Sequence, residues 1–215
     1  MIVINCAQGS EEWLRARAGV ITASMFNVAR QRLKSGPNKG DFTEAAKNYA
    51  FRLAIERISG DPLDEGFETY AMRRGHELEP AARAELEVQT GLIIQRAGFV
   101  LSDDGAFGAS ADGLIGADDG CELKCFIDPS KLRAFHIDND AGDVMEQAQG
   151  CMWITERSHW HIALYCPALA PVGKQLWWKR FERDEAFIEQ MQADLDSFRA
   201  LVDSFQAELQ KPIAA

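Results

Sequence analysis

The chain has 215 residues, of which 47% are hydrophobic and 26% are charged, as expected for a globular protein with one buried core. Its formal net charge of −10 argues against a protein that coats nucleic acid with its whole surface. The sequence shows no apolar run long enough to span a membrane and no N-terminal signal peptide, so we expect a protein of the cell interior.

The charge is unevenly distributed, which allows for a local basic cleft. Residues 1–60 carry nine lysines and arginines against five acids, a local charge of +4. An enzyme that grips phosphate in one cleft can therefore be acidic elsewhere. The five cysteines form no C-x-x-C pair, which favours free thiols over a zinc site or disulfides.

The N-terminal segment predicts a first helix through Arg17. Ser10 is suited to the N-cap, and two acids follow in the first turn. Trp13 and Arg17 are neighbours on one face of this helix, which predicts packing with a cation–π contact. The alternative is that Arg17 and Ser24 form an anion pocket, with Ser24 at the N-terminus of a second helix around residues 25–32.

Two longer helices are predicted next, over residues 43–59 and 69–90. The second contains Pro80, which lacks an N–H and clashes with the preceding turn, so we expect a break near Glu79. Glu79 either faces a site elsewhere in the fold or belongs to a solvated, salt-bridged helix face.

The centre of the chain predicts strands and hairpins. Residues 93–101 alternate loosely and predict one strand, which returns over residues 106–109 after a turn. The stretch 108–124, GASADGLIGADDGCELK, predicts a second hairpin with its turn at Asp118-Asp119-Gly120.

The second hairpin carries the residues with the clearest chemistry. Its pairing brings Asp112 beside Glu122 and Lys124, which share one face because the side chains of a strand alternate. Two carboxylates on a rigid sheet suit Mg²⁺ or Mn²⁺, and a lysine there can orient a water or neutralise charge on a phosphodiester. The alternative is an edge hairpin with a surface salt bridge.

The C-terminal half completes an α/β pattern. It predicts helices over residues 129–137, 144–156 and 184–210 and strands over residues 159–166 and 175–181. The second of these helices carries Gln147, which faces a cleft or water. The third is long and amphipathic. The last helix packs its apolar stripe on the sheet or forms a subunit interface. His159 and His161 share one strand face, but no third ligand lies nearby in the sequence, so we predict no metal site there. Together the elements predict one α/β (α+β) domain over residues 1–215, with a mixed or antiparallel central sheet.

Four sequence blocks occur in order between about residue 10 and about residue 166. They are Trp13-x3-Arg17-x-Gly-Val-Ile-Thr-Ala-Ser24, Gly75-x3-Glu79, Ser110-Ala-Asp112-Gly with Glu122-Leu-Lys124-Cys, and Gln147-x-Gln149-x2-Met-Trp153. Each block is weak alone, but the combination is specific. It resembles the phage lambda-type exonuclease family, also described as YqaJ-type viral recombinases, within the PD-(D/E)xK nucleases. The resemblance implies a restriction-endonuclease-like core with one nuclease domain.

The resemblance implies catalytic and metal-binding roles at matching positions. Asp112 and Glu122 look like the metal-binding carboxylates, with the Leu123 carbonyl as a further ligand. Lys124 resembles the catalytic lysine. Glu79 resembles a glutamate that supports the second metal or its waters.

Further positions match residues of the family that contact the DNA end. The residues that would hold the 5′-phosphate of the degraded strand are Arg17, Ser24, Ser110 and Gln147. Met72 lies where the family has an apolar wedge that separates the end base pair. Ala111 replaces the family's usual proline, which is not a ligand, so this departure changes little.

The activity implied by the resemblance is a Mg²⁺-dependent 5′→3′ exonuclease, with Mn²⁺ as a possible substitute metal. It would degrade one strand of linear double-stranded DNA to mononucleotides and leave 3′ single-stranded tails for recombination. The resemblance also implies a homotrimeric ring around DNA, a single-strand annealing protein as partner, and a phage or prophage gene expressed in the bacterial cytoplasm.

Two alternatives come from other functional classes. One is a structure-specific endonuclease, such as a resolvase, on the same core. The other is a non-enzymatic protein that binds DNA ends during recombination. Related nucleases carry an iron–sulfur cluster bound by a close cysteine trio, and because the sequence has no such trio we expect no cluster.

Overall fold

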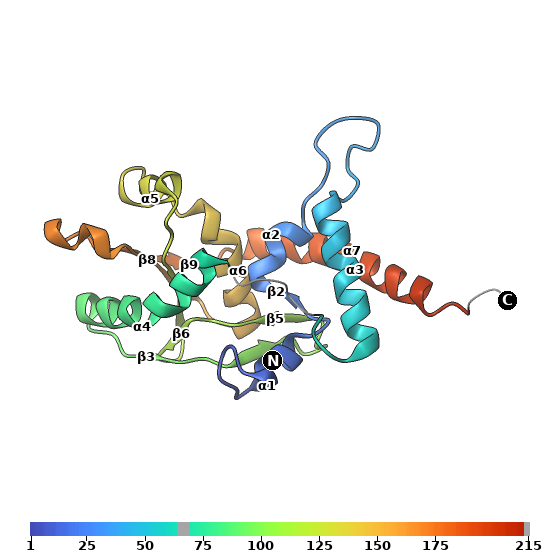
Figure 1. Ribbon diagram of the computed structural model, residues 1–215, viewed down its shortest axis with the longest axis horizontal. Helices are drawn as coiled ribbons and strands as arrows, with labels where there is room; N and C mark the ends of the chain where they lie inside the picture. Colours follow the sequence, from blue (N-terminus) through green and yellow to red (C-terminus); the bar gives the residue numbers. More distant parts are fainter. Residues whose placement is uncertain (64–68, 213–215) are drawn as a thin grey trace. The chain divides into compact units, whose positions relative to one another are not determined.

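The computed structural model describes residues 1–63 and 69–212 (Figure 1). The chain divides into two compact units, which comprise Met1–Asp64, Gly98–Ser110 and Asp184–Ala215 in the first and Glu65–Ala97 and Ala111–Arg183 in the second. Each unit contains one sheet with its own helices, which confirms the predicted α/β class. The assignment of residues 1–215 to a single nuclease domain stays a prediction. Within the described residues, no helix combines the length and apolarity that crossing a bilayer requires.

The first unit is built on a four-stranded sheet in the order β1-β4-β5-β2. Its elements are β1 (Ile2–Ile4), α1 (Glu11–Arg17), β2 (Ile21–Thr22), η1 (Ala23–Met25), α2 (Phe26–Ala29), α3 (Glu44–Ser59), β4 (Phe99–Leu101), β5 (Phe107–Ala109) and α7 (Glu185–Leu209). β4 pairs antiparallel with β1 and β5, whereas β2 joins β5 in parallel. The sheet is therefore mixed.

Side-chain caps begin three helices of this unit. The side chains of Ser10, Thr43 and Asp184 each accept a hydrogen bond from the N–H of the third residue that follows, at 3.2, 3.3 and 3.0 Å. Such caps satisfy N–H groups that a helix start leaves unpaired. The cap predicted at Ser10 is therefore present, and local sequence also sets the starts of α3 and α7.

The long helix α7 buries an apolar stripe, as its periodicity predicts. The buried residues are Ile188, Met191, Leu195, Phe198 and Val202. Phe198 stacks on Tyr49 with ring centroids 5.4 Å apart, and Phe205 meets Phe51 edge to face at 5.6 Å. Both partners belong to α3, so the aromatic part of the stripe covers a helix and not the sheet, which was one of its two predicted partners.

The second unit is built on a five-stranded sheet in the order β3-β6-β7-β8-β9. Its elements are α4 (Tyr70–Thr90), β3 (Ile94–Gln95), β6 (Gly113–Ile115), β7 (Asp119–Lys124), α5 (Pro129–His136), α6 (Gly142–Thr155), β8 (His159–Tyr165), η2 (Pro167–Val172) and β9 (Leu176–Glu182). β7 and β8 are parallel, and the other neighbours are antiparallel. This is the mixed sheet that the sequence predicts.

The two faces of strand β7 have different surroundings. The buried side chains of Cys121 and Leu123 join a hydrophobic cluster with Leu86 of α4. Because strand side chains alternate, Glu122 points to the other face, where Gln147 of α6 donates a hydrogen bond to its carboxylate. One strand thus carries both a core face and a polar face.

The predicted break near Glu79 is wrong. α4 is continuous from Tyr70 to Thr90, with Pro80 inside it. A proline costs an interior helix a hydrogen bond. The following turns bury Ala82 and Leu86 completely in the core of this unit, and this packing outweighs the local loss.

The single strand predicted over residues 93–101 is also wrong, because this segment forms β3 and β4, which belong to different sheets. Gly98 begins the part that joins the first unit. A Cβ on Gly98 would lie 2.1 Å from the carbonyl oxygen of Ile4. Glycine is needed there because the backbone of β1 approaches so closely.

The turn of the second hairpin is displaced from its predicted place. It occupies residues 116–118 rather than 118–120, and Gly116 takes a left-handed φ of +54°. The predicted pairing is nevertheless present, since Gly113 lies opposite Cys121. The register, rather than the turn residues, brings the polar side chains together.

Gly19, which links α1 to β2, is expected to tolerate no side chain. Its φ is +72°, and a Cβ would lie 2.5 Å from Cγ and 3.2 Å from the backbone nitrogen of Arg57. We expect Gly19→Ala to lower the free energy of unfolding by roughly 2–4 kcal/mol, from left-handed strain plus overpacking. Urea denaturation followed by circular dichroism measures this loss.

The matched control is Gly9→Ala. Gly9 has a similar φ of +81°, but a Cβ there meets no atom within 4 Å among the described residues. This variant should show the backbone strain alone, about 1–2 kcal/mol. Equal losses for the two variants would contradict the role given to the Arg57 contact.

Candidate active site

The β6–β7 hairpin brings together the predicted metal-binding carboxylates and the predicted lysine. The register that places Gly113 opposite Cys121 sets Asp112 beside Glu122. The backbone N–H of Leu123 donates to Asp112 Oδ2 at 2.7 Å. Lys124 Nζ donates to Glu122 Oε1, also at 2.7 Å. The surface salt bridge considered as an alternative is not what forms, because Glu122 is only 2% exposed.

Gln147 of α6 completes this group. Its Nε2 donates to Glu122 Oε1 at 2.7 Å, and its Oε1 accepts from Lys124 Nζ at 3.1 Å. The amide therefore bridges the carboxylate and the ammonium. The sequence left two orientations open for Gln147, toward a cleft or toward water. In the structure its side chain instead contacts strand β7, through Glu122 and Lys124.

Asp112 and Glu122 are two acids that lie close together and are buried, which decides their electrostatics. Burial, and then the charge of Glu122, raises the pKa of Asp112 well above its usual range. Burial lowers the pKa of Lys124, but attraction by Glu122 and Asp112 outweighs it and leaves that pKa raised. The lysine is therefore a permanent cation that partly offsets the two carboxylates.

The donor set fits a hard divalent cation. Glu122 Oε2 is buried and has no hydrogen-bond partner among the described residues. A buried carboxylate oxygen without a partner is costly, and a metal ion can satisfy it. Asp112, at its side, is an oxygen donor of the same kind. The Leu123 carbonyl as a further ligand stays a prediction.

Glu79 and Met72 lie on α4. Glu79 forms an ion pair with Arg83 one turn later, and its charge contributes to the raised pKa of Asp112. Both interpretations of Glu79 thus find support, since it is salt-bridged and also acts on the carboxylate site. Met72, in the first turn, is 48% exposed, as a DNA wedge would need, but its role stays a prediction.

The predicted anchor residues of the first unit form a second group. Arg17 lies over the ring of Trp13, with its guanidinium carbon 4.1 Å from the ring centroid. Arg17 Nη1 donates to Ser110 Oγ at 3.2 Å. Ser24 is exposed in η1, and its Oγ lies 3.4 Å from Thr22 Oγ1. The predicted cation–π contact is therefore present, and Arg17 also meets a second predicted anchor residue.

Helix α3 holds the segment that carries Arg17 and Ser24. The buried carboxylate of Glu56 accepts from Gly19 N at 2.9 Å, and Arg57 Nε donates to Gly19 O at 2.9 Å. The hydroxyl oxygen of Tyr49 accepts from Thr22 N at 3.2 Å. Backbone groups of the link between α1 and η1 are thus fixed from one helix.

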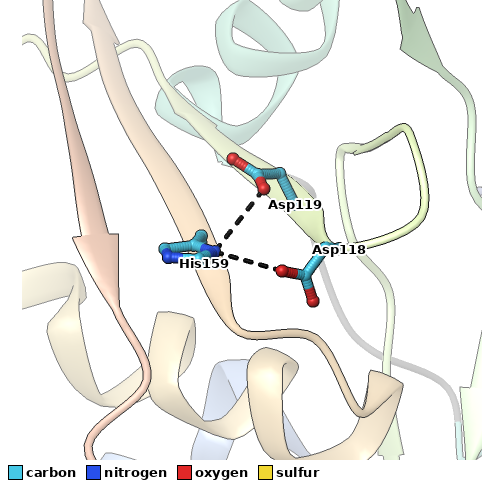
Figure 2. A group of neighbouring side chains, drawn as sticks. All are labelled: Asp118, Asp119 and His159. Atoms are coloured by element: carbon cyan, nitrogen blue, oxygen red, sulfur yellow. Dashed lines mark ion pairs between the residues drawn. The ribbon is translucent and has the colours of Figure 1, made fainter.

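A further cluster, absent from the sequence predictions, lies where β7 and β8 begin (Figure 2). Asp118, Asp119 and His159 each offer a ligand atom, and these atoms lie within 4.8 Å of one another. The parallel register places Asp119 opposite His159. This register brings two carboxylates that are about forty residues away in the chain beside His159. The expectation that no third ligand lies near the pair of His159 and His161 therefore does not hold in the folded chain.

In this cluster the carboxylate of Asp119 already has other hydrogen-bond partners. Arg180 donates to both carboxylate oxygens of Asp119, at 2.7 and 3.1 Å, and His161 Nε2 lies 2.9 Å from Oδ2. The hydrogen bond from Arg180 is the main reason that the pKa of Asp119 falls to about 2. A cation here would compete with the arginine, so the Asp112–Glu122 pair is the better metal site.

Comparison with known proteins identifies the family. A family model described as YqaJ-like viral recombinase domain matches residues 12–158, which is more than half of the chain. The chain belongs to this family. The resemblance deduced from the four sequence blocks is therefore confirmed. A comparison with curated proteins found no match.

Solved structures support the same assignment. The alkaline exonuclease LHK-Exo from Laribacter hongkongensis is 29% identical to this YqaJ-like chain over 94% of it and 96% of LHK-Exo. The TM-score is 0.81 for a complex of LHK-Exo with dAMP and 0.79 for a second structure. A phage related exonuclease from Haemophilus somnus 129PT, 18% identical over 89% of this chain and 96% of its own, shares the fold at a TM-score of 0.69. The nuclease family and the acidic clusters together suggest a divalent metal site.

Replacing Asp112 by asparagine is expected to stabilise the metal-free protein. A folded-state pKa raised above the unfolded value contributes stability at low pH that is lost as the pH rises through the folded-state pKa. The amide of the replacement has no proton to lose in this range, so Asp112→Asn should melt at a higher temperature than wild type in EDTA at about pH 8 and lose this advantage toward about pH 4. Thermal melts followed by circular dichroism test this.

The same melts with Mg²⁺ locate the metal. Mg²⁺ should raise the melting temperature of wild type but much less that of Asp112→Asn, because a ligand stabilises only the state that binds it. The matched control is Asp118→Asn, an exposed acid of the other cluster. Loss of the Mg²⁺ effect in Asp118→Asn, with retention in Asp112→Asn, would move the metal site to the start of β7.

Proposed function

We propose that this YqaJ-family chain is a metal-dependent 5′→3′ exonuclease that degrades one strand of linear double-stranded DNA to mononucleotides. The enzyme class rests on the family and on the alkaline exonuclease neighbours: the chain is a DNA exonuclease. The observation that carries the proposal is the buried Asp112–Glu122–Lys124 group on one hairpin. The metal-dependent activity itself, its polarity and its product are what the experiments below decide.

The residues suggest how hydrolysis would proceed. Asp112 and Glu122 would hold Mg²⁺, or Mn²⁺ in its place, together with the Leu123 carbonyl, and Glu79 would support a second ion or its waters. A bound ion of this kind lowers the pKa of a water and stabilises charge on a phosphodiester. Lys124, held by Glu122 and Gln147, would orient the attacking water and offset negative charge on the phosphate.

The polarity is proposed from the predicted anchor residues of the first unit. Arg17 and Ser110 are hydrogen-bonded to each other, and Ser24 is exposed on the same segment that α3 holds. These three residues would hold the terminal 5′-phosphate, which sets the strand and the direction of digestion. The remaining 3′ strand would be left single-stranded.

The proposal extends to partners through the family. A single-strand annealing protein would take over the 3′ tail, and three copies of the chain would form a ring around DNA. A ring needs a basic channel only, which reconciles DNA binding with a net charge of −10. The setting would be the cytoplasm of a bacterial host that carries a phage or prophage.

One digestion experiment tests the function. Linear duplex DNA labelled separately at each end, with 5′-phosphate or 5′-hydroxyl termini, is incubated with Mg²⁺ or EDTA beside a closed circle. We expect Mg²⁺-dependent release of the 5′ label as mononucleotide, faster with phosphate, and an intact circle. Cutting of the circle would instead favour a structure-specific endonuclease, and absence of any cutting would favour a DNA-end-binding protein.

Lys124→Ala is expected to lower the rate of digestion by at least about 100-fold, because a group that assists the attacking water or the charged phosphate is lost. Mg²⁺ should still raise the melting temperature of this variant, since the carboxylates remain. Lys47→Ala, which removes a partly exposed lysine of α3, is the matched control and should digest at the wild-type rate. Full activity of Lys124→Ala would refute the site.

Arg17→Ala is expected to act selectively on phosphorylated ends. Loss of charge-assisted hydrogen bonds worth about 1.5–3 kcal/mol predicts a roughly 10- to 150-fold slower digestion of 5′-phosphate ends. Digestion of 5′-hydroxyl ends should change little. Arg15→Ala, on the same helix with its side chain 67% exposed, is the control for charge alone. An equal loss on both ends would contradict the anchor.

A further inference from the structure

Ser110 has an unusual hydrogen-bonding position in the first unit. Its Oγ accepts from Trp13 Nε1 at 2.9 Å and from Arg17 Nη1 at 3.2 Å. A hydroxyl has two acceptor sites and one proton to donate. Both acceptor sites of Ser110 are therefore occupied, and among the described residues its proton is donated to no partner in turn.

The two groups that approach Ser110 cannot reverse their roles. An indole N–H only donates, and a guanidinium only donates and keeps its charge at any ordinary pH. Ser110 therefore cannot turn its proton toward Trp13 or Arg17. The proton is left to point away from both, where an incoming anion would accept it.

Trp13 contacts Arg17 as well as Ser110. Its ring lies under the guanidinium of Arg17 at 4.1 Å, while its N–H holds Ser110. The backbone N–H of Trp13 is in turn fixed by the cap at Ser10. One side chain at the start of α1 thus orients a cation and a hydroxyl toward each other.

We propose that Trp13 is a positioning residue that presets Ser110 as a hydrogen-bond donor to the terminal 5′-phosphate. This inference rests on the proposed function, because it assumes that Arg17 and Ser110 receive that phosphate. The inference goes beyond the proposed function because it gives Trp13 a role in the selection of 5′-phosphate ends, in addition to its packing. A hydroxyl already oriented as a donor loses no freedom when the anion arrives.

The test is a double-mutant cycle with Trp13→Phe and Ser110→Ala. Phenylalanine keeps an aromatic ring under Arg17 but has no N–H. The quantity measured is the ratio of single-turnover digestion rates on 5′-phosphate and 5′-hydroxyl ends. We expect Trp13→Phe to lower this ratio about 3- to 10-fold, less than the loss of a whole charged hydrogen bond. In the Ser110→Ala background the same change should have almost no effect.

Trp178→Phe is the matched control for loss of an indole. Trp178 lies on β9 in the second unit, and its replacement should leave the ratio unchanged. The rate on 5′-hydroxyl ends reports general damage to the fold, which would lower both rates together. The ratio therefore isolates recognition of the phosphate.

Two outcomes would overturn the inference alone. One is a wild-type ratio in Trp13→Phe, and the other is an undiminished effect of Trp13→Phe in the Ser110→Ala background, which would assign Trp13 to Arg17 or to the fold. A wild-type enzyme that digests both ends equally would overturn the phosphate anchor of the proposed function, and this inference with it. The preference of the wild type therefore separates the two failures.

Discussion

The structure of the site depends on one pairing, that of β6 with β7. It sets Asp112 beside Glu122 in a buried place, where two like charges repel and neither is fully hydrated. Lys124 and Gln147 relieve only one oxygen of Glu122. A divalent cation would offset the remaining repulsion and give a partner to Oε2, which has none among the described residues.

The first unit shows a different principle, in which hydrogen-bond polarity is fixed by the donors. Ser110 receives two N–H groups that cannot accept, and the link that carries Arg17 is held by Glu56 and Arg57 of α3. Each of these contacts can be weak and still matter. Together they restrict the orientations open to the Ser110 hydroxyl and the Arg17 guanidinium before an anion binds, which lowers the entropy cost of binding.

The sequence predicts much of the site because its central part is local. Asp112, Glu122 and Lys124 lie on one short hairpin, so alternation and a turn suffice to bring them together. The contacts of Gln147 with Glu122 and Lys124 depend on how α6 packs on the sheet. The cluster of Asp118, Asp119 and His159 depends on a parallel register between strands that are about forty residues apart in the chain, which no local pattern encodes.

By itself, the sequence determined the features that arise from neighbouring residues: the capped starts of α1, α3 and α7, the face shared by Glu122 and Lys124, and the family motifs. The tertiary structure alone decided whether α4 continues through Pro80, where the segment around Gly98 divides between two sheets, and which helix the stripe of α7 covers. The physical reason is that caps and strand alternation act over a few residues, whereas burial of large apolar surfaces is set by distant partners and is large enough to override a local penalty such as that of proline.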